Sequence, residues 1–356
     1  MKARSAMIQG GLAVAGLLAA YVTWQRPKDT ARPDAVTVFT ASKQSLEKVH
    51  FDDGSRFVEV VRKLEGEPRL WVTLGFLPGK APPPTDGGTL VMMVDAGVDA
   101  GLIAANVKPP EPAPTREMLA NERADTLFQR FMPFDATRAL GQLPKDKLDE
   151  LGLTATDRHL EVTIAGQVRR FTVSRPVPGI IGTYVQDDVS HDVYLVQGAV
   201  FSDLDPGSQL LVDRRLHAFR QPEFDAFTVE SQGTSVDFVQ SNADIPQSAK
   251  VARAATPDKP DEMAKNWHDK ILSRLVVTEV LGKGELPKEG EPKVRLRIDY
   301  RSHGAKKGWL EIGFDPGGFT WARSENTASW VSIHQGSEEV VLEAQKVLRG
   351  TSTSER

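Results

Sequence analysis

Ser190, His191 and Asp192 are consecutive residues with the side-chain types of a catalytic triad. On an extended chain, neighbouring side chains point to opposite faces, so these three cannot converge on one another. The flanking segments TYVQD (183–187) and VYLVQ (193–197) are typical of strands. The sequence therefore predicts a polar turn between two strands, and no catalytic residue is expected there.

His50 and Asp52 are a second pair that could do chemistry. They are two apart on a predicted strand, so they share a face, and with Asp53 nearby they have the residue types of metal ligands. The segment that contains them, LEKVHFDDGSRFVEVV (46–61), resembles FDAFTVESQGTSVDFV (224–239), in which the matching positions are Thr228 and Glu230. This replacement favours an ordinary solvated strand face over a metal site.

A strand runs into a helix through Gln197 and Gly198 in DVYLVQGAVFSDL (192–204), and phosphate-binding loops occur at such junctions. A phosphate loop needs several glycines, or a lysine and a hydroxyl, because backbone N–H groups must approach the anion. Here one glycine carries the turn. The dipeptide recurs at 335–336, where Glu338 and Glu339 follow and would repel a phosphate. The recurrence predicts a structural corner.

Two further loops fall short of ligand motifs. GFLPGK (75–80) is one residue shorter than a Walker loop and is followed by Ala81 in place of serine or threonine. SDLDPGS (202–208) lacks the third ligand, the placed glycine and the terminal glutamate of a calcium loop. We therefore expect no cofactor, no metal site and no enzymatic activity.

The composition narrows the class of protein. The chain has 356 residues and a net charge of -4, and residues 1–28 carry four positive charges and no acid. The rest is therefore mildly acidic and has no basic stripe, which argues against a nucleic-acid partner. Cysteine is absent, which removes thiol catalysis, cysteine-ligated zinc and disulfides.

Residues 5–24, SAMIQGGLAVAGLLAAYVTW, contain no charged side chain. Twenty helical residues reach about 30 Å, the thickness of the bilayer hydrocarbon. Lys2 and Arg4 precede the segment, and Trp24 stands at its far edge, where an indole favours the interface. The sequence predicts an uncleaved single-pass anchor in the bacterial inner membrane. A cleaved signal peptide is the alternative, because Ala13-Val14-Ala15 fits a small-x-small cleavage site inside the apolar run.

The rest of the chain reads mostly as strands with a few helices. Apolar segments predict strands at 71–77 and 89–95, a meander predicts strands at 160–164 and 169–174, and strict alternation predicts one at 294–300, besides those already quoted. Helices are expected at 115–131, capped by Thr115, at 144–153, stopped by Gly152, and at about 199–211 and 262–275.

The two halves of the chain resemble each other. TYVQDD (183–188) matches TWARSE (320–325), and the two hairpins that contain His50 and Thr228 match as well. We therefore predict an α+β fold of two tandem similar units, each an antiparallel β-meander with packed helices, after an N-terminal transmembrane helix. The expected boundaries are a cytoplasmic stub 1–4, anchor 5–24, tether 25–42, repeat unit 1 at 43–212, join 213–222, repeat unit 2 at 223–349 and disordered tail 350–356.

The run DKLDELGL…LEVTI…RRFTVS…TYVQ…DVYLVQ…VDRRLHAF (146–219) resembles a bacterial domain-of-unknown-function family. Members of that family have one N-terminal membrane helix and a repeated extracytoplasmic α+β body. They are often encoded beside ABC transporter components of the gliding-motility type and their auxiliary protein. The resemblance implies no catalytic residues. This chain departs from it in Pro-rich loops at 79–88 and 108–115.

These observations favour a non-catalytic accessory or interaction protein that is anchored in the inner membrane and projects its body into the periplasm. The expected partners are membrane lipid and a membrane protein complex, with ABC transporter subunits and an auxiliary protein as the family implies. The alternative is a periplasmic ligand-binding or sensing module with a cleft between the two repeats. Candidate ligand or partner contacts are Tyr184, Trp321, Trp330, Arg214 and Arg215.

Overall fold

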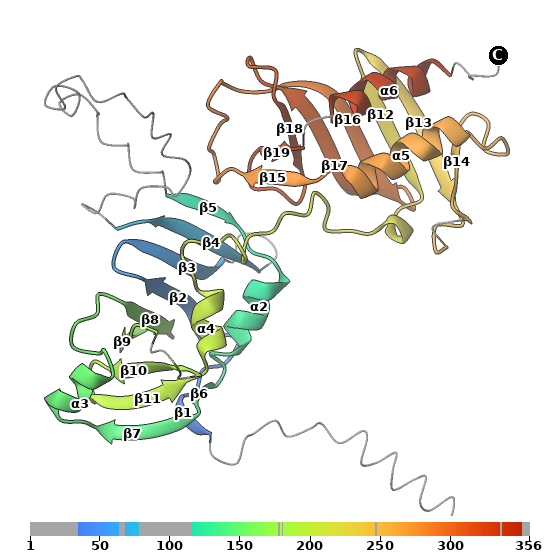
Figure 1. Cartoon of the computed structure of the whole chain (residues 1–356). Coiled ribbons are helices and arrows are strands. Elements are labelled where there is room, and N and C mark those ends of the chain that lie inside the picture. Colours follow the sequence, from blue (N-terminus) through green and yellow to red (C-terminus); the bar gives the residue numbers. More distant parts are fainter. Residues whose placement is uncertain are drawn as a thin grey trace, which may run out of the picture.

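A computed structural model describes residues 35–63, 68–77, 115–176, 179, 181–245, 248–334 and 337–350. It is a mixed α+β structure that is rich in antiparallel strands, as the sequence predicts. Two large sheets dominate it, and Figure 1 shows helices on one face of each. We call the first sheet with its helices the first unit, and the second sheet with its helices the second unit.

The first unit has a nine-stranded sheet in the order β5-β4-β3-β2-β8-β9-β10-β11-β7. Helices α2 and α4 lie on one face of it (Figure 1). A separate two-stranded sheet, β1-β6, lies beside it. The elements are β1 (Val36–Phe39), β2 (Leu46–Asp52), β3 (Arg56–Lys63), β4 (Arg69–Phe76), β5 (Arg116–Leu119), α2 (Glu122–Gln129), β6 (Phe134–Ala136), β7 (Arg138–Gln142), α3 (Lys145–Glu150), β8 (His159–Ile164), β9 (Gln167–Val173), β10 (Thr183–Asp187), β11 (Asp192–Val196) and α4 (Gly198–Asp203).

The second unit has an eight-stranded sheet in the order β14-β13-β12-β16-β17-β18-β19-β15. Helices α5 and α6 lie side by side on one of its faces (Figure 1). The elements are the short 3-10 helix η1 (Gln221–Glu223), β12 (Ala226–Ser231), β13 (Thr234–Ser241), β14 (Lys250–Arg253), α5 (Glu262–Arg274), β15 (Val277–Val280), β16 (Lys293–Ser302), β17 (Ala305–Phe314), β18 (Thr320–Ser324), β19 (Val331–Ile333) and α6 (Glu338–Arg349).

From β4 to β7 the first sheet has the same succession of strands along the chain as the second sheet has from β14 to β15. The register also corresponds in the central strands. Val49 of β2 lies opposite Val60 and Val162, and Phe227 of β12 lies opposite Phe238 and Tyr300.

Alternation along the strands separates a buried face from a polar one in both sheets. In β2 and β3, Val49, Phe51 and Val60 are buried, whereas the intervening His50 and Glu59 are half-buried. The buried faces meet the helices, and their apolar side chains belong to one cluster that includes residues of both units. Burial of such side chains is the usual source of stability in layered folds. The opposite sheet faces carry no helix among the described elements and are lined with ion pairs.

Two helix boundaries differ from those predicted. The helix expected from Thr115 to residue 131 begins only at Glu122, because Arg116–Leu119 pair with β4 as an edge strand. Asn121 is the actual N-cap, and its side chain accepts from the N–H groups of Arg123 and Ala124. The helix expected at 199–211 ends at Asp203, shortly before Pro206, which cannot continue a helix.

Other local predictions are confirmed. Helix α3 ends just before Gly152, whose φ of 69° suits a glycine after a helix. Helix α5 covers the range predicted at 262–275, and Asp261 caps it. The predicted strands at 71–77, 160–164, 169–174, 183–187, 193–197 and 294–300 correspond to β4, β8, β9, β10, β11 and β16. The hairpins at 46–61 and 224–239 are also present.

Residues 36–39, assigned to the tether by the sequence, form strand β1, and Phe39 is buried. The predicted anchor 5–24, the strand 89–95, the Pro-rich segments 79–88 and 108–114, the second Gln-Gly at 335–336 and the tail after Gly350 lie outside the described residues. Among the helices that the structure does describe, none is long and apolar enough to cross a membrane.

The two units contact each other through an edge strand and through the join. The backbone N–H of Lys283 donates to the carbonyl of Glu117 on β5 at 2.7 Å. Arg116 of β5 forms ion pairs with Glu279 at 2.9 Å and Glu285 at 2.8 Å in the second unit. This docking covers the outer edge of β5, and sheet edges are otherwise open to pairing with other chains.

Candidate functional site

Tyr184, Trp321 and Trp330, predicted as cleft residues, do not meet in one place. Tyr184 lies on β10 in the first sheet and is half-buried. Trp321 and Trp330 are buried together in the second unit, in a small cluster with Leu281. The Trp321 indole N–H donates to Asp315 at 2.9 Å, and the Arg323 guanidinium lies 4.5 Å from the centroid of the Trp330 ring. Both tryptophans therefore have structural partners.

Arg214 and Arg215 are exposed on the join. Arg215 forms ion pairs with Asp213 at 2.9 Å and with Glu122 at 3.0 Å. The hydrogen bonds that Arg215 donates to the carboxylate of Asp213 are the main reason that the pKa of Arg215 is raised. Arg214 donates to the side chain of Gln209 at 2.8 Å. Arg215 thus holds the join to α2, which is a structural role.

The triad-like residues form the polar turn that the sequence predicts. They lie between β10 and β11, where His191 has a φ of 61°. The carboxylate of Asp187 accepts from the backbone N–H groups of Val189 and Ser190 and so stabilises the turn. The three side chains are not hydrogen-bonded to one another by any contact found in the described chain.

His50, the metal-site candidate, has its Nδ1 3.3 Å from the carboxylate of Glu59 on the neighbouring strand. Burial raises the pKa of the Asp52 carboxyl. Within the residues that the structure describes, no group of histidines and carboxylates could hold a metal ion. Gln197 caps α4 without a side-chain hydrogen bond, and the helix that follows Gly198 has only six residues.

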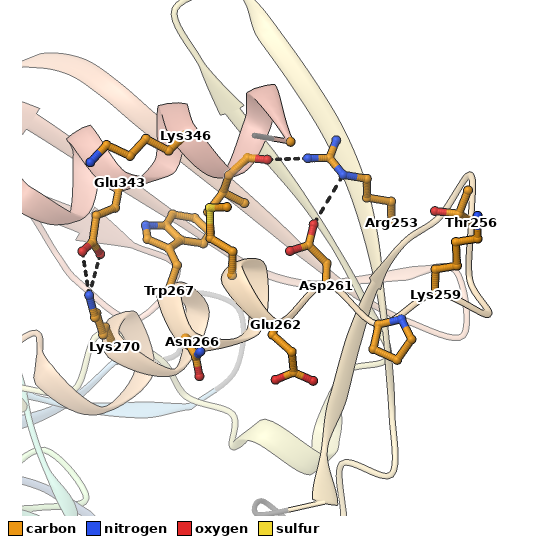
Figure 2. Close-up of a pocket in the computed structure, with 14 residues that line it drawn as sticks. Arg253, Thr256, Lys259, Asp261, Glu262, Asn266, Trp267, Lys270, Glu343 and Lys346 are labelled. Carbon is orange, nitrogen blue, oxygen red and sulfur yellow. Dashed lines mark hydrogen bonds and ion pairs between the residues drawn. The ribbon is translucent and has the colours of Figure 1, made fainter. Parts of the chain in front are cut away.

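A groove of about 730 Å³ lies between α5, α6 and β14. Figure 2 shows Lys270 and Glu343 pointing toward one another across it, and Arg253 reaching Asp261. Arg253 also donates to the carbonyl of Val347 at the end of α6. These charged side chains connect α5, α6 and β14 to one another, so their role in the second unit is structural. The ring of Trp267 is buried behind them.

A larger cavity, of about 1010 Å³, lies where the two units and the join meet. Its walls come from the start of the first unit, strands β3 to β5, helix α2, the join and the loop after β18. They are Lys43, Gln44, Leu46, Glu47, Arg62, Pro68, Arg69, Leu70, Leu119, Ala120, Asp125, Asp213, Arg215, Ala218 and Asn326. We call this the junction cavity. The sequence analysis did not identify it, although a cleft between the halves was its alternative hypothesis.

Asn326 connects the parts that form the junction cavity. It is buried, and its amide nitrogen donates to Asp213 at 3.2 Å and to the carbonyl of Arg215 at 2.9 Å. Arg69 of β4 reaches its side-chain oxygen at 3.5 Å, which is at the long limit of a hydrogen bond. The first unit, the join and the second unit therefore converge on one buried amide.

The charges of the junction cavity are unevenly partnered. Arg215 and Asp213 pair with each other, and Glu47 accepts from the backbone N–H of Gly166. In contrast, no ion pair among the described residues involves Lys43, Arg62 or Arg69. Partial burial raises the pKa of Asp125, whereas Lys43 and Arg62 lower it, so both cations act on this carboxylate without contacting it.

The second unit contains a buried polar cluster that the sequence did not reveal. His268 is fully buried, and its Nε2 lies 3.3 Å from the hydroxyl of Tyr300. Nearby, His217 of the join lies 3.2 Å from Glu325, which also accepts from the backbone N–H of Trp309. Burial, and then His217, lower the pKa of His268 to about 3. Nδ1 of His268 and Nε2 of His217 are buried without a hydrogen-bond partner.

Comparison with known proteins adds no assignment, because no family model, curated protein or solved structure matches the chain. The junction cavity and the helix-free sheet faces are the structural features that a functional hypothesis can add to the sequence patterns.

Proposed function

We propose that the chain is a non-catalytic, membrane-anchored accessory or interaction protein of the bacterial inner membrane. Residues 5–24 are its anchor, and the folded body lies in the periplasm. It works with a membrane protein complex of the ABC-transporter type, including the gliding-motility type with its auxiliary protein. The apolar N-terminal segment and the family resemblance of 146–219 support this assignment.

The body on this proposal is an internal duplication, with repeat unit 1 at 43–212 and repeat unit 2 at 223–349. The observation that supports it is the shared strand succession and register of the two sheets. Both meanders are also followed by a helix, α4 in the first unit and α6 in the second. Superposition of the two units in an experimental structure tests the duplication, and unrelated paths of β8–β11 and β16–β19 would refute it.

A duplicated, docked body presents two helix-free sheet faces to a partner. On these faces, charged side chains are paired along and across strands: Arg297 forms an ion pair with Asp299 of its own strand and another with Glu311 of the neighbouring strand. Half-buried Trp309 lies beside Arg297, with 5.6 Å between the guanidinium and the ring centroid. Such amphipathic aromatic residues are enriched in protein interfaces.

Photo-crosslinking in native membranes tests the interaction. A crosslinking residue replaces Thr73 on the helix-free face of the first sheet or Trp309 on that of the second. Thr126, on the exposed side of α2, is the control position. We expect one membrane protein to be captured from the sheet positions and not from Thr126. Recovery of the chain alone from both sheet positions would contradict the proposal, and a C-terminal reporter active only in the cytosol would contradict the topology.

A further inference from the structure

We propose that the junction cavity is a binding site for a small organic anion, with Lys43, Arg62 and Arg69 as the side chains that hold its carboxylate or phosphate group. This inference is independent of the partner proposed above, because the cavity lies on the helix side of the first sheet and at the join. It concerns a ligand, whereas the proposed function concerns a membrane protein.

The first argument is the state of the three cations. Within the described residues, the guanidinium of Arg62 donates one hydrogen bond, of 3.4 Å, to the carbonyl of Leu46, and it lies 5.1 Å from the centroid of the Phe128 ring. Among the described residues, the side chain of Arg69 has one polar contact, at 3.5 Å to Asn326. A guanidinium offers a planar fork of N–H donors that matches a carboxylate or phosphate, and most of these donors remain available here.

The second argument is the comparison with the second unit. The hairpin register places Gln240 at the position of Arg62, because Val61 and Val239 lie opposite Lys48 and Ala226. Gln240 is buried and donates to the carbonyls of Phe224 and Gln221 at 3.2 and 3.1 Å. A neutral, satisfied amide therefore meets the needs of the fold at this position, and the charge of Arg62 is surplus to them.

The third argument is the shape and lining of the site. A volume of about 1010 Å³ is at the upper end of small-molecule pockets, and such pockets favour the boundary between domains. Leu46, Leu70 and Leu119 contribute apolar wall, which suits a ligand with a carbon skeleton beside its anionic group. Of the acidic wall residues, Glu47 and Asp125 have no ion pair among the described residues. Asp125 interacts with Lys43 and Arg62 through space, so it disfavours a second negative charge on that side.

Isothermal titration calorimetry on the full-length chain in an uncharged detergent tests the site. The probes are citrate, inorganic phosphate and short-chain phosphatidylglycerol, with short-chain phosphatidylcholine as the zwitterionic control. We expect one anion per chain. Binding of citrate or phosphate assigns a free anion, whereas binding of phosphatidylglycerol alone assigns a lipid headgroup. No heat with any of the three anions would overturn the proposal.

Substitutions locate the binding. Arg62→Gln, which installs the residue of the second unit, and Arg69→Gln should each weaken binding by about 10- to 100-fold, the usual effect of losing a charge-assisted hydrogen bond. Arg170→Gln, on the helix-free face of the same sheet, is the matched loss of one exposed positive charge and should change nothing. Equal weakening by Arg170→Gln would mean diffuse charge attraction and would overturn the site.

Asp125→Asn should change the affinity in the opposite direction. Removing this carboxylate removes repulsion, so binding of citrate should tighten several-fold, while the circular dichroism spectrum stays unchanged. Weaker binding in Asp125→Asn would show that the ligand needs a negative partner in the cavity, and the assignment to an anion would be wrong.

Discussion

The two units build the same strand succession around different interiors. Helix α2 places Phe128 against the sheet near its C-terminal end, whereas α5 places His268 at the matching position, counted from the N-caps Asn121 and Asp261. Both side chains are fully buried. Tyr300 lies beside His268, and the corresponding position of the first sheet holds Val162, since Val162 pairs with Val49 as Tyr300 pairs with Phe227. One interior is thus apolar, and the other contains a hydrogen-bonded imidazole and phenol.

This difference teaches that the polar pair is not needed to form the layer. A buried imidazole loses its hydration, and its unpartnered Nδ1 adds an unsatisfied group. The second unit therefore has a free-energy cost of burial at His268, whereas the first unit has the apolar Phe128 at the same place. At the helix-facing end of the hairpin it is the first unit that has the more polar side chain. Arg62 stands there with a positive charge, whereas the second unit has the neutral Gln240.

Exchanging the buried ring is the most severe test of the comparison. Phe128→His should lower the free energy of unfolding by about 3–4 kcal/mol, because a smaller polar ring replaces a packed apolar one and no partner like Tyr300 is available at Val162. Urea unfolding followed by circular dichroism measures the loss. Phe128→Leu, which keeps the site apolar, should cost clearly less. A change below about 1 kcal/mol for histidine would show that the first interior can also satisfy an imidazole.

The reverse exchange, His268→Phe, should change the pH dependence of stability. The pKa of His268 is lowered to about 3 in the folded state, below its ordinary value of 6.5, so the unfolded chain binds more protons between these pH values. Stability is therefore full above pH 6.5 and falls as the pH decreases toward 3. At pH 5 this amounts to about 2 kcal/mol, which His268→Phe should restore.

The measurement is the free energy of unfolding of both proteins at pH 7 and pH 5. At pH 7 the exchange should have a small effect, because an unpartnered nitrogen disappears while Tyr300 loses its partner. Tyr300→Phe is the control, since a phenol does not titrate in this range and the slope with pH should be unchanged. The same slope in His268→Phe as in the native chain would contradict the assignment of the proton to His268.

How far the sequence predicted this architecture depended on the range of the interactions. The hairpins at 46–61 and 224–239 were predictable because alternation and a glycine turn act within a few residues. The predicted start of α2 was wrong. Thr115 has the side chain of an N-cap, but Arg116–Leu119 pair with the edge of β4 as a strand. That edge is distant in the chain, and local propensity does not report it.

The junction cavity lay beyond sequence reasoning for the same reason. Lys43, Arg62 and Arg69 belong to three separate segments, and only the docking of the join and of Asn326 makes them walls of one space. The one local signal was the difference between Arg62 and Gln240 in the aligned hairpins. The aromatic residues chosen instead, Trp321 and Trp330, are buried, as large aromatic residues within folded units often are.

Breaking the contact between the units tests whether the comparison concerns two independent bodies. Asn326→Ala should lower the free energy of unfolding by about 1–2 kcal/mol, because buried Asp213 loses a hydrogen bond. We expect one thermal transition for the native chain, and in the variant we expect it to broaden or divide as the units uncouple. Asn266→Ala, an exposed asparagine on α5, is the control. An unchanged transition in Asn326→Ala would mean that Arg116 and Lys283 suffice to hold the units together.

The smallest effect on stability is expected on the helix-free faces, where the two units form a polar cross-strand pair at matching positions with different residues. His50 pairs with Glu59 at 3.3 Å, and at the matching positions Thr228 donates to Asp237 at 2.5 Å. His50→Thr should therefore change stability at pH 7 by less than about 0.5 kcal/mol, as is usual for half-exposed polar pairs.

The same substitution should still be visible in the titration of Glu59. The hydrogen bond from His50 is the main cause of its lowered pKa, with burial opposing and Lys48 assisting. In His50→Thr, nuclear magnetic resonance should show the pKa of Glu59 rising toward its ordinary value. Because a lowered carboxyl pKa contributes stability that is lost as the pH falls through it, the variant should lose less stability on acidification than the native chain. An unshifted pKa would show that Lys48 alone sets the charge of Glu59, and that the two cross-strand pairs are not equivalent.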